Sequence, residues 1–180
     1  YELNDKNNTA KVHHSECFCK IQRSIHFNSK EYLVTGIKEG CLHNDIPYND
    51  HFVYFDDDVQ ISSIEKNTFI NSPNIKILEI PASLEEFKDG WCNSVEILEK
   101  LKISPKNKNF RLINEKMLVG KLNPKKDIFD VLIFACRDII QAKIPSYIKR
   151  ISPFCLSNCS KLSQFELSEN SELRTICNDA

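Results

Sequence analysis

A set of apolar positions recurs along the second half of the chain with a spacing of 23 residues. Adding 23 to six such positions gives a second apolar set, and adding a further 64 gives a third. All 18 positions are apolar when Cys is counted as a small hydrophobic residue, whereas 41% apolar content would supply about seven by chance. A partial copy lies 23 residues before the third. The copies are Ile61, Ile64, Phe69, Ile75, Leu78 and Ile80; Leu84, Phe87, Cys92, Leu98, Leu101 and Ile103; Ile148, Ile151, Leu156, Leu162, Phe165 and Leu167; and, partially, Ile128, Ile133, Ile139, Ala142 and Ile144.

A period of 23 is typical of leucine-rich repeats, and each copy ends in the L-x-x-L-x-L pattern of their strands. The last two apolar residues of that pattern are two apart, so both side chains point inward from a strand. Burying one copy contributes at most ~9–18 kcal/mol, and ordering its 23 residues costs ~25–45 kcal/mol, so single copies cannot fold alone. We therefore predict an α/β leucine-rich-repeat fold that is mostly a β solenoid, with a parallel sheet on one face and little helix. Leu101 and Phe165 should point into its core.

Charge and patterning divide the chain near residue 58. Residues 1–58 hold 6 basic and 10 acidic side chains, and they begin with a polar, Asn-rich start that we expect to be frayed. Aromatic and β-branched runs at Lys30–Ile37 and His51–Phe55 predict strands. We interpret 1–58 as a degenerate, β-rich capping region and 59–180 as the repeat solenoid.

The 23-residue period breaks at about 104–127. Two apolar runs, Phe110–Ile113 and Met117–Gly120, are separated there by three polar residues. This pattern predicts a β-hairpin inserted into the solenoid.

Three segments of the repeat region carry a family resemblance. Ile80–Phe87 and Ile144–Ile151 are similar to the "IPxSLxxI" opening of BspA-like leucine-rich repeats, and Leu156–Leu162 is similar to their "FxxCxxL" segment. The resemblance covers roughly residues 59–180, and the segments Asp130–Ile139 and Phe165–Leu173 are similar to protist members of the family. It implies a non-enzymatic surface antigen or adhesin that binds a host protein, a matrix protein or a glycan through its repeat face. It also implies that the protein is at the cell surface or secreted. The sequence itself shows no signal peptide or membrane segment, so a cytoplasmic location stays open as the alternative.

Composition argues against several other classes of protein. The 24 basic and 25 acidic residues leave a net charge of -1 and no basic field for nucleic acid or an acidic membrane. No apolar run reaches the roughly 18 residues that span a bilayer. With 4 glycines, phosphate-cradling loops and their nucleotide cofactors are not expected. We predict no cofactor.

A second hypothesis places a metal-binding or small enzymatic unit at the His- and Cys-rich start, with the repeats as its scaffold. His13, His14, Cys17 and Cys19 are ligand types that zinc prefers, but no second pair with finger spacing follows. We therefore predict neither a metal ligand nor a catalytic residue. Asp56-Asp57-Asp58 lacks the Gly and Glu of a calcium loop and is interpreted as a solvated turn.

The residues that flank the inward pair of each predicted strand should face outward. Glu79 is then expected beside Lys102, and Lys143 beside Glu166, because stacked copies align in register. These side chains either solvate the sheet and keep its register, or form a mixed-charge platform for a protein or glycan partner. The candidate binding residues are Ile77, Glu79, Lys100, Lys102, Gln141, Lys143, Gln164 and Glu166.

Cys136 and Cys159 are 23 residues apart and should be stacked neighbours about 4.8 Å apart. Their side chains would point the same way, which is poor geometry for a disulfide. Buried free thiols are therefore favoured over a disulfide.

Overall fold

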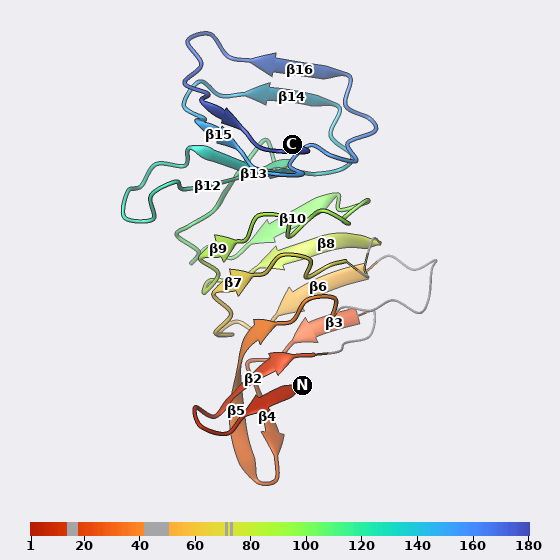
Figure 1. Ribbon diagram of the computed structural model, residues 1–180, viewed down its shortest axis with the longest axis vertical. Coiled ribbons are helices and arrows are strands. Elements are labelled where there is room, and N and C mark those ends of the chain that lie inside the picture. Colours follow the sequence, from red (N-terminus) through yellow and green to blue (C-terminus); the bar gives the residue numbers. More distant parts are fainter. Residues whose placement is uncertain (14–17, 42–50, 71, 73) are drawn as a thin grey trace.

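The structure is a computed structural model that describes residues 1–13, 18–41, 51–70, 72 and 74–180. The described chain coils through an elongated stack of strands and contains no helix within those ranges (Figure 1). The predicted β solenoid with parallel sheets is confirmed. No helix in the described ranges is long and apolar enough to cross a membrane.

Six strands form two parallel sheets along one face of the stack. The first has the order β10-β8-β6-β3, and the second pairs β14 with β16. Leu101 lies beside Leu78 and Ile103 beside Ile80, as the 23-residue period predicts. The strands are β3 (Phe18–Ile21), β6 (His51–Phe55), β8 (Ile75–Ile80), β10 (Lys100–Ile103), β14 (Gln141–Ile144) and β16 (Gln164–Leu167).

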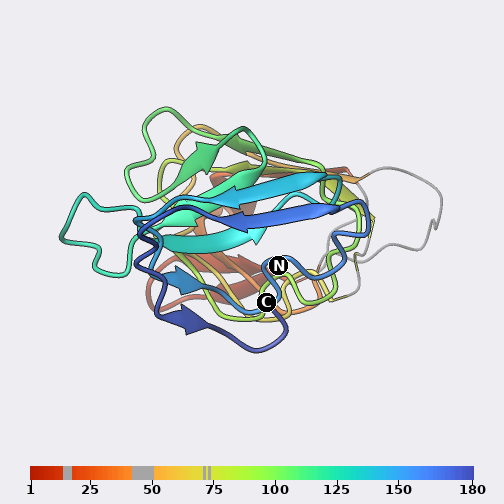
Figure 2. The ribbon, with the colours of Figure 1, turned by 90° about the horizontal axis from the view of Figure 1, so that it is seen from above.

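A second face carries the short strands that begin each repeat. β7 pairs with β9, and β15 pairs with both β13 and β17, all in parallel. Seen from above, β15 and β17 lie on a different side of the stack from β14 and β16 (Figure 2). Ile64, Leu84 and Ile148 are buried inside this coil. The strands are β7 (Ser63–Ile64), β9 (Glu86–Phe87), β13 (Val131–Ala135), β15 (Arg150–Ile151) and β17 (Thr175–Ile176).

The predicted hairpin is present as β11 (Arg111–Ile113) and β12 (Met117–Gly120). Asn114 and Glu115 turn the chain with φ of 49° and 58°, and the Lys116 amide donates to the Ile113 carbonyl at 3.1 Å. Two successive positive φ values match the right-handed twist of the flanking strands. The hairpin joins a five-stranded sheet of order β11-β12-β13-β15-β17.

β12 and β13 separate two hydrophobic cores, because both faces of these strands are buried. Leu118 and Ile133 belong to the larger core, which extends back to the first repeats. Met117 and Leu132 belong to the smaller core, which lies under the last repeats. The insert is therefore an internal wall of the stack. Gly120 allows this close packing, since a Cβ there would lie 2.6 Å from Cδ1 of Ile133.

The start of the chain, predicted to be frayed, instead forms paired strands. β1 (Glu2–Asn4) pairs with β2 (Thr9–Val12), and β2 pairs with β5 (Lys30–Ile37). The Tyr32 hydroxyl donates to Asp5 at 2.5 Å, and Lys38 forms an ion pair with Glu2. These polar contacts order a segment that has few apolar residues.

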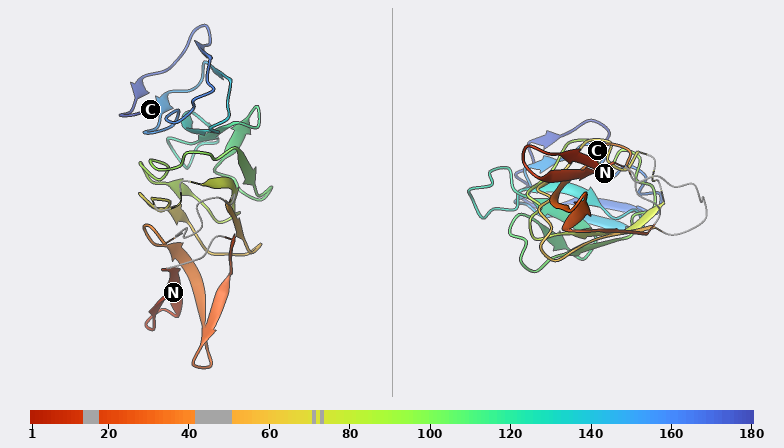
Figure 3. Two further views of the ribbon diagram at one scale, coloured as in Figure 1. Left: turned by 90° about the vertical axis from the view of Figure 1, so that its right-hand side faces the viewer. Right: turned by 90° about the horizontal axis from the view of Figure 1, so that it is seen from below.

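A second hairpin pairs β4 (Ser24–Phe27) with β5 and extends past the end of the stack (Figure 3).

Both strands predicted before residue 58 are present, as β5 and β6. The pairing of β6 with β8 runs across the predicted boundary at 58 and 59. The division into two folding units stays a prediction.

Leu101 and Phe165, the two side chains that were predicted to point into the core, differ in burial. Leu101 is 4% exposed, as predicted, but Phe165 is 46% exposed, so its predicted burial is wrong. Phe165 still occupies its strand position beside Ala142. β16 is the outer strand of its sheet, so no further described coil covers it.

Candidate interaction face

The predicted sheet-face residues fall into two groups of four. On the first sheet, Lys100 lies beside Ile77 and Lys102 lies beside Glu79. On the second, Gln141 lies beside Gln164 and Lys143 beside Glu166, so both predicted charge pairings are in register. The two sheets share no strand pairing, and the structure does not join the two groups into one continuous platform. All eight are exposed except Ile77 and Glu79, which are half-buried.

The first sheet carries aromatic side chains that the repeat pattern did not reveal. Phe52 lies beside Ile77 in register, and its ring stacks on that of Tyr54 with centroids 6.2 Å apart. Both rings are half-buried, whereas the alternate residues Val53 and Phe55 point into the core. Val53 pairs with Leu78 at an offset of 25 (78 − 53), so a period of 23 misses this copy. The alternation within His51–Phe55 is the signal that indicates the outward pair.

Charged groups surround these rings. The Lys102 ammonium lies 5.2 Å from the centre of the Tyr54 ring, within the range of a cation–π contact. The Phe55 amide donates to Glu79 at 3.2 Å. At the edge of the patch, Lys20 forms a 2.8 Å ion pair with Asp56. We call Phe52, Tyr54, Ile77, Glu79 and Lys102 the aromatic patch.

Asp56, predicted to lie in a solvated turn, is tied to the strand beside it. It accepts hydrogen bonds from the Lys20 ammonium and, at 3.0 Å, from the Arg23 amide. The hydrogen bond from the Lys20 ammonium is the main cause that lowers the pKa of the Asp56 carboxyl, and the hydrogen bond from the Arg23 amide lowers it too. Asp58 forms an ion pair with Arg23 at 3.2 Å. The carboxylates therefore stabilise local structure.

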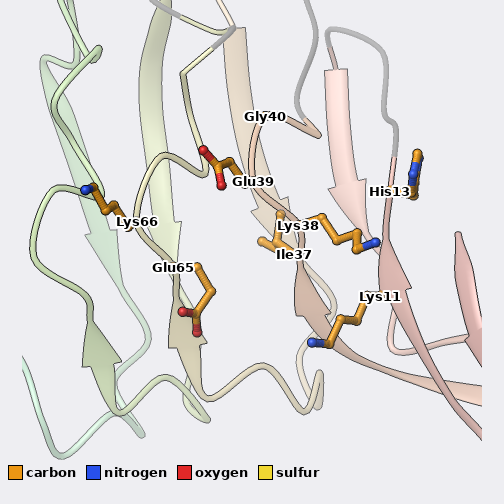
Figure 4. A pocket seen from close by; sticks show the side chains of 8 residues that line it. All are labelled: Lys11, His13, Ile37, Lys38, Glu39, Gly40, Glu65 and Lys66. Carbon is orange, nitrogen blue, oxygen red and sulfur yellow. The ribbon is translucent and has the colours of Figure 1, made fainter.

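A hollow of about 900 Å³ lies between the N-terminal strands and the first repeats. Lys11, Lys38 and Lys66 line it together with Glu39 and Glu65 (Figure 4). Glu39 accepts a hydrogen bond from Asn67, and Lys38 is paired with Glu2. The positive and negative side chains that line the hollow therefore largely balance one another. They favour neither an anionic nor a cationic ligand.

The predicted His and Cys cluster falls mainly outside the described residues, since His14 and Cys17 are not described. His13 lines the hollow of Figure 4. In the described part of the chain, no three His, Cys, Asp or Glu side chains are placed to hold a metal ion. No observation therefore favours the metal-binding or enzymatic hypothesis over interaction.

Four cysteines surround a buried arginine in the interior. Arg137 is 3% exposed, and its guanidinium donates to the carbonyls of Val95, Cys155 and Phe154 at 3.0–3.1 Å. It also contacts Cys159 Sγ at 3.7 Å. Cys136 and Cys159 are among six cysteines whose thiols are free, so these two form no disulfide, as predicted. The cysteines around Arg137 are Cys92, Cys136, Cys155 and Cys159.

Burial disfavours the reactive thiolate form of three of these cysteines. It raises the pKa of Cys92 and of Cys136 from 9.0 to about 12, and it also raises the pKa of Cys155 well above its usual value. At pH 8 the thiolate fraction of Cys92 and Cys136 falls about a thousandfold below that of a thiol of pKa 9. We expect iodoacetamide to modify both at least a hundredfold more slowly in the native protein than in urea, as measured by peptide mass spectrometry. Equal rates in the two states would contradict this.

The same shifts predict a loss of stability in alkali. Folded thiols keep their protons to higher pH than unfolded ones, so their contribution is complete below pH 9 and declines as the pH rises toward about 12. Urea unfolding of wild type and of a Cys92→Ala, Cys136→Ala variant at pH 8 and pH 10.5 tests this. The decline should be smaller in the variant, and an equal decline would exclude these thiols as its source.

Known proteins share both the sequence pattern and the fold. A family model described as a BspA-type leucine-rich repeat region, in six copies, matches residues 6–117 and 123–180. A leucine-rich repeat protein of Eubacterium ventriosum superposes with a TM-score of 0.63 and 21% identity, over 81% of this chain and 36% of that one. A leucine-rich cell surface protein of Faecalibacterium prausnitzii gives 0.51 and 14%, over 97% and 69%. The chain thus spans about a third of the first of these proteins, and no curated protein matches significantly.

Proposed function

Because the chain belongs to the BspA-type leucine-rich repeat family, we propose that it binds a host protein, matrix protein or glycan through the outward face of its first parallel sheet. Repeats of this family are generally interaction scaffolds without catalytic activity. The proposal includes a role as a surface antigen or adhesin, at the cell surface or secreted. The F. prausnitzii protein with the same fold is described as a cell surface protein, which supports this location.

The aromatic patch is the observation that carries the proposal. Tyr54 and Phe52 present rigid rings on a sheet that is fixed by the buried core beneath it. Large, preorganised aromatic side chains with a neighbouring cation are the usual anchors of protein interfaces, and each can contribute about 2 kcal/mol or more. Lys102 and Glu79 add charges of both signs beside the rings, which favours a partner with mixed polarity over nucleic acid.

Exchange of the patch residues tests the proposal. We expect Tyr54→Ser to weaken binding to an immobilised panel of purified matrix proteins and glycans at least tenfold, because it removes a ring from the centre of the patch. Lys102→Glu should weaken binding to an acidic site and change the unfolding free energy by less than about 1 kcal/mol. Surface plasmon resonance measures the affinity, and urea unfolding measures the stability.

Lys125→Glu is the matched control, because Lys125 is exposed in the loop between β12 and β13. It makes the same change of charge away from the patch. Binding that survives Tyr54→Ser and Lys102→Glu in folded protein would exclude this face. Absence of binding to every member of the panel would exclude the proposed class of partner.

A further inference from the structure

We propose that the free edge of β10 binds an extended acidic peptide, which pairs with β10 as an additional strand. The site is a hollow between β10 and the β11–β12 hairpin. It uses the backbone of the sheet edge and does not require the aromatic patch to bind a partner. The proposal therefore goes beyond the function proposed above. Lys102 belongs to both surfaces, so the N-methylated peptide and the amide exchange described below, rather than the lysine variant, distinguish the two proposals.

β10 has one unpaired edge. It is the terminal strand of the order β10-β8-β6-β3, and β14 is set apart from it along the stack (Figure 1). The Ser104 amide donates to the Ile80 carbonyl at 2.9 Å, and amides alternate in direction along a strand. The amides and carbonyls of Leu101 and Ile103 therefore point away from β8. Unpaired groups of this kind recruit an added strand.

Space for such a strand lies beside this edge. A hollow of about 550 Å³, within the range of ligand sites, is lined by Lys100 and Leu101 of β10 and by Leu112 of β11. Four further charged residues complete its lining: Glu99, Glu115, Lys116 and Asp138. Leu112 belongs to β11, which is the terminal strand of its own sheet. At one end, the Lys116 ammonium bridges the Glu99 carbonyl and Asp138 at 3.0 and 2.6 Å. This bridge joins the tip of the hairpin to the segment before β10 and to the segment after β13.

The outward side chains of β10, rather than the mixed charges that line the hollow, indicate which residues the added strand carries. Lys100 and Lys102 are exposed on β10, and neither forms an ion pair with any residue of the described chain. Within the solenoid, a lysine on one strand lies beside a glutamate on the neighbouring strand, as Lys102 does beside Glu79 and Lys143 beside Glu166. A strand added on the other side of β10 meets the same lysines, so acidic residues at its outward positions complete the pattern.

A second copy of the chain fits this edge less well. Pairing two β10 strands would place Lys100 and Lys102 of one copy against the same lysines of the other. Like charges directly opposite each other on neighbouring strands are destabilising. The charges therefore favour a peptide partner over self-association.

A blocked, fluorescently labelled octapeptide that alternates glutamate with valine is the probe. Fluorescence anisotropy should show saturable binding, and the Lys100→Glu, Lys102→Glu double variant should weaken it at least tenfold. The peptide N-methylated at every second amide, on the side that faces β10, should also bind at least tenfold more weakly, because its ladder donors are lost. NMR amide exchange at Leu101 and Ile103 should slow at least tenfold when the peptide is saturating.

Matched controls separate this site from general charge attraction. The Lys125→Glu, Lys126→Glu variant makes the same change of charge in the exposed loop after β12 and should alter affinity less than twofold. An alternating lysine–valine peptide should not bind. Absence of saturable binding, equal binding of the N-methylated peptide, or unchanged exchange at Leu101 and Ile103 would overturn the proposal. Dimerisation in solution that Lys100→Glu, Lys102→Glu abolishes would overturn it in favour of a second copy.

Discussion

Replacing Arg137 with methionine should lower the free energy of unfolding by about 3–5 kcal/mol, because several buried carbonyls lose their donor at once. The guanidinium joins three segments, since it donates to Val95 before β10, to Ala135 in β13, and to Phe154 and Cys155 after β15. Its plane also lies 4.3 Å from the Phe134 ring. Methionine fills similar space without any donor. Urea unfolding measures the difference.

Two further variants separate hydrogen bonding from charge at this position. Arg137→Lys keeps the charge but cannot reach the same carbonyls in a fork, so it should recover less than half of the loss. Arg174→Met removes an exposed arginine of the last repeat and should change stability by less than about 0.5 kcal/mol. A loss below about 1 kcal/mol for Arg137→Met would show that the carbonyls are satisfied without the guanidinium.

Truncating Phe134 to alanine should lower the unfolding free energy by about 3–5 kcal/mol, the usual effect of emptying a buried aromatic site. Phe134 is fully buried in the wall between the two cores, and its ring centroid lies 5.2 Å from that of Trp91. The stability of a repeat stack depends on contacts between neighbouring units. Weakening this contact should therefore reduce the cooperativity of unfolding.

The single tryptophan makes this measurable, because Trp91 lies in the larger core. Trp91 fluorescence and far-UV circular dichroism should give one coincident urea transition in the wild type and two separate midpoints in Phe134→Ala. Phe27→Ala, which truncates a half-exposed ring on the β4 strand, serves as the control and should leave both midpoints within error of the wild type. Coincident midpoints in Phe134→Ala would show that the two cores unfold as one unit regardless of the wall.

Sequence alone determined the repeating unit and the direction of its side chains. The spacing of Ile75, Leu78 and Ile80 predicted a strand, and the same spacing 23 residues later predicted its neighbour and the pairing of Glu79 with Lys102. These properties are local, because a side chain's direction follows from strand geometry and register follows from repeat length. The hairpin was equally visible, as two apolar runs around a polar turn.

Only the tertiary structure decided how the repeats are assembled. The hairpin became a wall between two cores, and β10 and β14 do not pair with each other, which no local pattern around Asn114 indicates. An offset of 25 residues placed Tyr54 on the sheet face, and the outer position of β16 left Phe165 in contact with water. Periodicity records which way a side chain points within its own coil, whereas burial depends on whether another coil lies on top of it. That depends on the lengths and paths of distant segments, so it emerges only when the whole stack is formed.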